Sequence, residues 1–274
     1  IAVLGASTAL NAQNTRPAHS VTPWAHDSSD LQVDGRVHYG SFKNGMRYAW
    51  ADLPKPEDRV YLRLHVDVGS FGESDSQAGM AHFLEHMAFN GSENFAAGTL
   101  IEWFQDHGMS FGADTNAHTA FSETVYKLDL PNRDEKTLRE GMLVMSDFAR
   151  GMTIANDEVQ AEKGVIDGEQ RERDSAGYRV LVQGLERQYK GTLLAKRLPI
   201  GTKPVRDEFT GESVREFYTK WYRPENMTMV IVGDLRGYNP EQLIAEFFEG
   251  FAGPDIPVDN EPEMGEPTLD DLTF

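Results

Sequence analysis

Hydrophobic and polar residues alternate along several short stretches of the chain, which is the pattern of half-buried β-strands. The clearest run is Arg59–Val68, where Val60, Leu62 and Leu64 share one face. A hairpin is indicated where Asn44-Gly45 separates two strand-like runs. We therefore predict strands over residues 59–68, 110–114, 119–130 and 226–232, and a hairpin over residues 37–53.

Apolar residues recur with helical spacing between these strands. Leu138, Met142 and Met145 predict a core helix over residues 135–150. Asn156 is a suitable N-terminal cap for a long helix that runs towards Tyr189. Shorter helices are predicted over residues 99–107, 212–221 and 240–247. Because strands and helices mix without strict alternation, the sequence predicts an α+β fold with a mostly antiparallel sheet backed by helices.

A further predicted helix, around residues 79–90, carries His82, Glu85 and His86 in the order His-x-x-Glu-His. Residues four apart lie about 40° apart around a helix, so both imidazoles can face one ion, with Glu85 beside them. Apolar neighbours surround the motif and predict a buried helix, in which these polar groups need partners. The alternative is a surface helix with two solvated histidines. Two nitrogen ligands beside a carboxylate favour metal-assisted hydrolysis.

Composition narrows the classes of function. The chain has 44 acidic and 26 basic residues, a formal net charge of −18, which makes it a poor candidate for binding nucleic acid. It has no cysteine, so any metal must be held by His, Asp or Glu. No run of about 18 apolar residues is found, so we predict no membrane span in this sequence.

The two ends of the sequence differ from its middle. Residues 1–12 are small and apolar and resemble the end of a signal peptide, with cleavage after Ala9 or Ala12; a disordered apolar tail is the alternative. From residue 253 onwards, four prolines lie among acidic residues. We therefore expect a signal-peptide remnant and flexible lead-in over residues 1–30, a metal-binding domain over 31–252 and an acidic, Pro-rich linker over 253–274.

A catalytic zinc site usually has three protein ligands, so a third must come from elsewhere in the chain. The helix after Asn156 carries a stripe of acidic residues. Two of them, Glu162 and Glu169, lie within about 20° on the helix face and roughly 10 Å apart along its axis, so they cannot bind the same ion. One could bind a metal while the other orients a histidine. A solvated acidic face is the alternative, favoured for Glu158 and Glu172, and spacing does not choose between Glu162 and Glu169.

Several blocks of the sequence, in order over about residues 37–251, resemble the pitrilysin and insulinase peptidases, inverted zincins that include the mitochondrial processing peptidase. His82-Phe-Leu-Glu-His86 resembles the zinc helix of that family. Leu198-Pro-Ile-Gly201 is similar to a block of its long, exported bacterial members. The remaining blocks resemble the substrate-pairing strand, the second zinc-binding helix and the final structural strand, at residues 112–126, 162–169 and 221–234.

The resemblance implies roles for individual residues. One Zn²⁺ would be held by His82, His86 and Glu169, and Glu162 would hold a ligand histidine. Glu85 would be the general base that activates a zinc-bound water. The residues that pair with the substrate backbone as an added strand would be Asn116, Ala117 and His118.

The resemblance also implies a zinc metalloendopeptidase, exported to the periplasm of a Gram-negative-type bacterium, that cleaves peptides or unfolded segments. Its fold would be one half of a clamshell, with residues 31–252 as the catalytic domain. A second, homologous and inactive half, fused or separate, would supply an Arg and a Tyr to the site. The chain alone is then expected to bind zinc but to hydrolyse peptides poorly. The alternative is a non-catalytic scaffold or partner subunit, which is disfavoured because all the motif residues are present.

Overall fold

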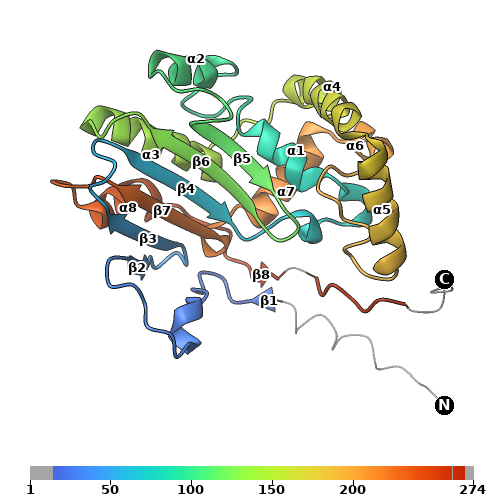
Figure 1. The fold of residues 1–274 in the computed structure, drawn as a ribbon, viewed down its shortest axis with the longest axis horizontal. Helices are drawn as coiled ribbons and strands as arrows, with labels where there is room; N and C mark the ends of the chain where they lie inside the picture. Colours follow the sequence, from blue (N-terminus) through green and yellow to red (C-terminus); the bar gives the residue numbers. More distant parts are fainter. Residues whose placement is uncertain (1–14, 261, 269–274) are drawn as a thin grey trace.

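The computed structural model describes residues 15–260 and 262–268, and Figure 1 shows a mixed sheet with helices around it. The strands are β1 (Thr15–Arg16), β2 (His38–Ser41), β3 (Arg47–Asp52), β4 (Val60–Val66), β5 (Thr115–Thr119), β6 (Thr124–Leu130), β7 (Met227–Gly233) and β8 (Val258–Asp259). The α-helices are α1 (Met80–Met87), α2 (Thr99–Asp106), α3 (Glu135–Arg150), α4 (Asn156–Arg173), α5 (Ala176–Gln188), α6 (Lys203–Asp207), α7 (Gly211–Trp221) and α8 (Pro240–Phe248).

Six strands form the main sheet in the order β2-β3-β7-β4-β6-β5. Only β3 and β7 run parallel, and the other neighbours are antiparallel. Side chains of β4 and β6 alternate strictly between buried and half-buried positions, as expected for strands with one covered face. The predicted α+β fold with a mostly antiparallel sheet is confirmed, and β5 is left at one edge of the sheet.

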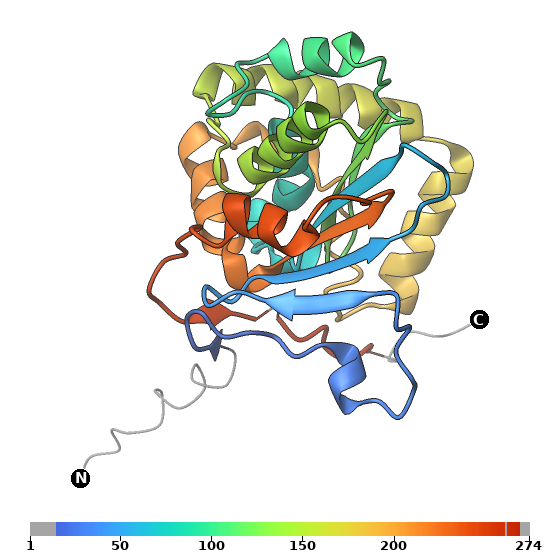
Figure 2. The ribbon, with the colours of Figure 1, turned by 90° about the vertical axis from the view of Figure 1, so that its left-hand side faces the viewer.

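Helices α3 and α8 lie side by side on one face of this sheet (Figure 2), where they cover the buried side chains of its strands. Leu138, Met142 and Met145 of α3 are completely buried, so the predicted core helix is confirmed. Helix α1 lies next to β5 and α4 (Figure 1). None of the helices that the structure describes combines the length and the apolar character needed to cross a bilayer.

Two strand predictions are wrong. Residues 110–114 form a turn, because the Asp114 carboxylate accepts hydrogen bonds from the backbone N–H and the hydroxyl of Ser110, both at 3.0 Å. Gly112 has a φ of +93°, which an extended strand does not allow. The predicted strand over residues 119–130 is divided by a second turn, where the Ala120 N–H bonds the carbonyl of Glu123 at 2.8 Å, so that β5 and β6 form a hairpin.

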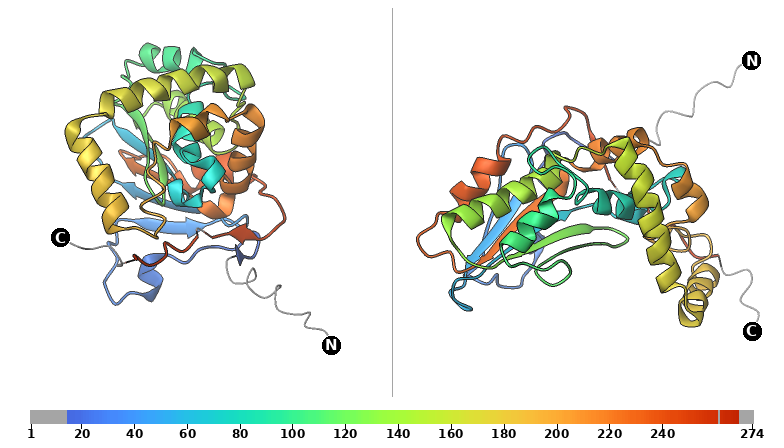
Figure 3. Two further views of the ribbon diagram at one scale, coloured as in Figure 1. Left: turned by 90° about the vertical axis from the view of Figure 1, so that its right-hand side faces the viewer. Right: turned by 90° about the horizontal axis from the view of Figure 1, so that it is seen from above.

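The predicted long helix from Asn156 towards Tyr189 is also interrupted. Ser175 is extended, and its side chain accepts a hydrogen bond from the Tyr178 N–H at 3.1 Å, which caps a new helix. Figure 3 shows α4 and α5 as separate rods that meet at an angle. Glu162 and Glu169 therefore lie together on α4, whereas the residues after 174 belong to a separate helix with a different axis.

The first and the last of the described strands pair with each other. Strand β1 pairs with β8 in a small antiparallel sheet, so residues 258–259 lie beside residues 15–16. The predicted signal-peptide remnant, with its cleavage after Ala9 or Ala12, lies outside the described residues. The division into a lead-in, a catalytic domain and a linker remains a prediction.

Candidate metal centre and active site

Helix α1 begins at a point that the surrounding chain fixes closely. The buried side-chain carboxyl group of Glu73 accepts the N–H groups of Gly79 and Ala81, each at 2.9 Å, and so satisfies two of the free donors of the helix N-terminus. Gly201 packs against this turn with a φ of +64°, and a Cβ there would lie 2.3 Å from the Ala78 carbonyl oxygen. The motif residues are therefore carried on a rigid, almost completely buried helix.

Three predicted ligand side chains converge between α1 and α4. The Nε2 atoms of His82 and His86 lie 3.2 Å apart, and Oε2 of Glu169 lies 3.5 Å from the first and 3.7 Å from the second. In the described part of the chain, these three residues form the one group of His, Asp or Glu side chains whose geometry could hold a metal ion. Glu162, in contrast, lies outside this group.

The donor atoms fit a divalent cation. Oε2 of Glu169 is buried and has no hydrogen-bond partner among the described residues, which is costly for a carboxylate oxygen. Burial, the neighbouring His86 and Arg173 lower the pKa of His82 to about 3, so its imidazole is neutral near pH 7 and can offer a lone pair. Two imidazole nitrogens and one carboxylate are a ligand set that suits zinc.

Glu162 contacts the back of the second histidine. Its Oε1 lies 2.7 Å from Nδ1 of His86, while its Oε2 accepts a hydrogen bond from the Asn90 side chain at 2.6 Å. Burial lowers the pKa of His86, but the Glu162 bond and the nearby carboxylates outweigh it and raise that pKa overall. A carboxylate on Nδ1 holds the proton there and turns Nε2 towards the metal group.

Glu85 lies beside the metal group and outside it. Its Oε2 accepts a hydrogen bond from the Thr119 hydroxyl at 2.7 Å. Burial raises the pKa of Glu85, against the opposing effect of this bond. A buried carboxylate of raised pKa next to a candidate metal is suited to take up and release a proton.

All eight residues singled out from the sequence line one cavity of about 680 Å³. Asn116, Ala117 and His118 lie on the edge strand β5, which pairs with β6 on one side only. The structure therefore brings the candidate ligands, the candidate base and the candidate substrate strand together. Phe89, Ile101 and Phe111 add an apolar wall to the same cavity.

The sequence patterns did not identify three residues that contact the predicted site residues. Asn90 and Thr119 hold Glu162 and Glu85, and no spacing rule relates them to the residues they hold, because the contacts are made across the fold. Arg173 forms an ion pair with Oε1 of Glu169. This last contact joins residues four apart on a helix, a spacing that is readable from sequence.

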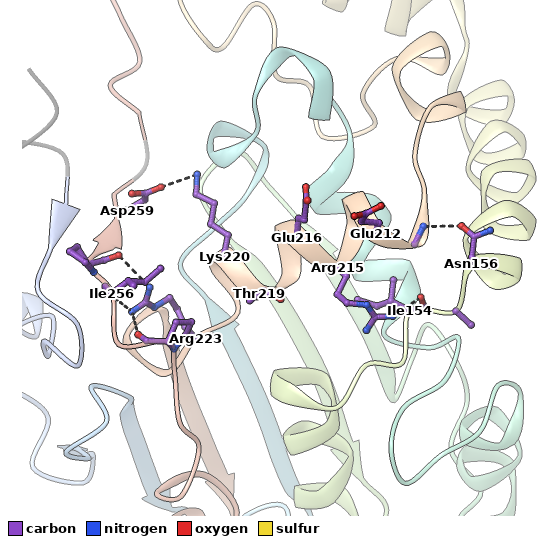
Figure 4. A pocket seen from close by; sticks show the side chains of 14 residues that line it. Ile154, Asn156, Glu212, Arg215, Glu216, Thr219, Lys220, Arg223, Ile256 and Asp259 are labelled. Atoms are coloured by element: carbon purple, nitrogen blue, oxygen red, sulfur yellow. Dashed lines mark hydrogen bonds and ion pairs between the residues drawn. The ribbon is translucent and has the colours of Figure 1, made fainter. Parts of the chain in front are cut away.

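A larger cavity of about 1030 Å³ lies elsewhere, between the outer face of α7 and residues 254–259 (Figure 4). Its cations have partners already: Arg215 donates to the carbonyls of Thr153 and Ile154, and Lys220 pairs with Asp259 at 2.9 Å. Arg223 donates to the carbonyls of the C-terminal segment. The metal group is not near this cavity, so we place the chemistry in the smaller one.

A buried His-x-x-Glu-His helix that faces a glutamate of a second helix, beside the edge of a mostly antiparallel sheet, defines the class of inverted zincins. Comparison with known families agrees. Residues 52–197 match the insulinase family (peptidase family M16), and residues 208–272 match the inactive domain of that family. The chain belongs to the insulinase family.

Several of the similar proteins are named as zinc proteases or processing peptidases. The chain is 37% identical over 216 residues to the probable zinc protease PqqL of Escherichia coli, which covers 79% of this chain and 23% of that protein. It is 30% identical over 210 residues to the chloroplastic stromal processing peptidase of Pisum sativum, covering 76% of this chain and 16% of that protein. The chain thus spans less than a quarter of the length of these relatives.

Solved structures share the fold. The crystal structure of the periplasmic protease PqqL from Escherichia coli matches with a TM-score of 0.81 and 33% identity, over 87% of this chain and 26% of that one. The crystal structure of the first half of the same protease matches with a TM-score of 0.80 and 33% identity, over 86% of this chain and 50% of that one. The half-clamshell fold predicted from the sequence is therefore confirmed.

Proposed function

We propose that the chain is the zinc-binding domain of a metalloendopeptidase. The observation that carries this proposal is the buried, unpartnered Oε2 of Glu169, which faces two histidine Nε2 atoms beside Glu85. His82, His86 and Glu169 would hold one zinc ion. When bound, zinc would supply a Lewis acid that polarises the scissile carbonyl and lowers the pKa of water.

The remaining steps belong to the side chains around that group. Glu85 takes a proton from the attacking water and later passes it to the leaving amine. Thr119 holds the Glu85 carboxylate in one orientation through its 2.7 Å hydrogen bond. Glu162 keeps the proton of His86 on Nδ1, so that Nε2 remains available as a ligand.

We propose that the substrate is an extended peptide or an unfolded protein segment. The edge strand β5 offers backbone groups on its open side, and Asn116, Ala117 and His118 lie next to Glu85 in the same cavity. An added strand needs an extended, flexible partner, which a folded protein surface seldom supplies.

We propose a second, homologous half as the partner of this domain. Support comes from the match of residues 208–272 to the inactive domain of the family and from relatives that are much longer than this chain. Export to the periplasm is proposed by analogy, since one structural relative is a periplasmic protease. On this view, residues 31–252 are the catalytic domain and residues 253–274 lead towards the second half.

The test combines metal content with cleavage. The purified chain should contain or take up one zinc, and a longer natural chain that includes a second half should cleave an unstructured peptide in a chelator-sensitive reaction. Glu85→Gln should retain zinc and lose cleavage, because the amide cannot accept the proton. Cleavage that survives in that variant would remove Glu85 as the base, and failure to bind zinc would remove the function itself.

A further inference from the structure

We propose that Arg173 is a positioning residue for the third zinc ligand, an inference that rests on the proposed zinc site. Arg173 follows Glu169 by one helical turn, and its Nη2 forms an ion pair with Oε1 of that carboxylate. The other oxygen, Oε2, faces the two histidine Nε2 atoms. The two oxygens of Glu169 thus have separate partners, and Arg173 fixes which of them points into the site.

Glu169 needs such a contact because the end of α4 is weakly packed. The last buried residue of the helix is Ile166, and none of the residues from 167 to 173 is buried. This part of the helix is held by the buried Arg206, whose guanidinium donates to the side chains of Asp167, at 2.9 Å, and Gln170, at 2.5 Å. These contacts hold the backbone around Glu169, but none of them is made to the Glu169 side chain.

Two effects of Arg173 on zinc binding have opposite signs. As a cation near a dication, it weakens binding by repulsion. As a partner of Oε1, it holds the ligand oxygen in place and strengthens binding. The Arg173 side chain is 51% exposed, so solvent and salt screen the repulsion. Losing a contact that orients a ligand typically lowers metal affinity about tenfold or more. Orientation should therefore prevail, and removal of Arg173 should weaken zinc binding.

Arg173 also lines the cavity, so it has an alternative role as an anchor for a substrate carboxylate. That role predicts a different result: a higher KM for peptides, with zinc affinity unchanged. A repulsive role alone predicts tighter zinc binding when the charge is lost. The zinc dissociation constant of a variant that lacks the Arg173 charge therefore distinguishes the three roles.

The experiment measures the zinc dissociation constant by competition with a chromophoric chelator at physiological salt. Arg173→Met removes the contact, and Arg173→Lys keeps a cationic donor. Arg171→Met is the matched control, because Arg171 is exposed on the same helix and its side chain has no hydrogen bond or ion pair in the described part of the chain. We expect about tenfold weaker binding for Arg173→Met, partial recovery for Arg173→Lys and no change for Arg171→Met.

Two further readouts separate positioning from general damage. The melting temperature of the metal-free protein should be the same for Arg173→Met and Arg171→Met, because both side chains are exposed. The absorption spectrum of the cobalt-substituted protein should change only for Arg173→Met. Equal or tighter zinc binding by Arg173→Met would overturn the inference. Wild-type protein that binds no zinc would instead overturn the proposed function.

Discussion

Replacing Glu162 by glutamine tests whether this buried carboxylate supports the metal site through His86. Glu162 is 7% exposed, and its Oε1 lies 2.7 Å from His86 Nδ1. A hydrogen bond to a charged group contributes about 1.5–3 kcal/mol, compared with about 0.5–1.5 kcal/mol for a neutral one. The loss of charge in Glu162→Gln should thus weaken zinc binding by about 1.4 kcal/mol, roughly tenfold.

A second contact adds to this effect. If the glutamine oxygen accepts from His86, its amide N–H₂ faces the Asn90 side-chain donor, which now bonds Oε2 at 2.6 Å. These two donors face each other unless the Asn90 amide turns over to present its oxygen, and in either case Asn90 loses a charged acceptor. Glu162→Ala, which removes both bonds, should approach the upper end of the usual range, about a hundredfold.

The assay is a zinc competition titration, with thermal unfolding of the metal-free proteins in parallel. Glu172→Gln is the control, since Glu172 is exposed on the same helix and carries the same charge. If Glu162→Gln binds zinc as tightly as Glu172→Gln does, the account of His86 is refuted. The same conclusion would hold if the zinc affinity of Glu162→Gln fell only because the metal-free variant is unfolded.

Three further outcomes are expected. Thr119→Val should lower kcat about tenfold at unchanged zinc content, because Glu85 loses its hydrogen bond, and Thr119→Ser, which keeps a hydroxyl, should restore kcat. An unchanged kcat for Thr119→Val in the longer, active chain would contradict the role of this hydrogen bond. Gly201→Ala should lower the melting temperature, since its Cβ would lie 2.3 Å from the Ala78 carbonyl oxygen; a stability equal to wild type would show that the loop adapts. Burial raises the pKa of Glu73 to about 8, above its ordinary value of 4.5, so the folded state favours the protonated side chain. The protonated side chain therefore stabilises the fold fully below pH 4.5, and this stabilisation is lost as pH rises towards 8. Metal-free wild type should thus lose stability between pH 5 and 8 more steeply than Glu73→Gln in thermal unfolding, and parallel curves would exclude this effect.

The spacing of hydrophobic residues predicted correctly those strands and helices that bury a single face. Strand β4 and helix α3 alternate or repeat as their sequences indicate, because each has a single buried face. The break between α4 and α5 was missed because Tyr178, Val182 and Leu185 continue a helical spacing past Ser175. The capping ability of Ser175 was the available signal, and it is decided by a single hydrogen bond.

The candidate site shows a different limit. The motif on α1 places His82 and His86 on one face by helix geometry alone. The choice between Glu162 and Glu169 depends on where α4 crosses α1, which is a matter of tertiary packing and not of spacing within α4. The structure places Oε2 of Glu169 at the histidine Nε2 atoms and Glu162 at Nδ1 of His86. Thr119 and Asn90 were missed for the same reason.

Zinc-edge anomalous diffraction from crystals of the zinc-loaded chain would locate the metal and its ligands. We expect one anomalous peak, bonded to Nε2 of His82, Nε2 of His86 and Oε2 of Glu169, with Glu162 on Nδ1 of His86 and Glu85 unbound beside the metal. A peak bonded to Glu162 in place of Glu169, or no peak between α1 and α4, would contradict it.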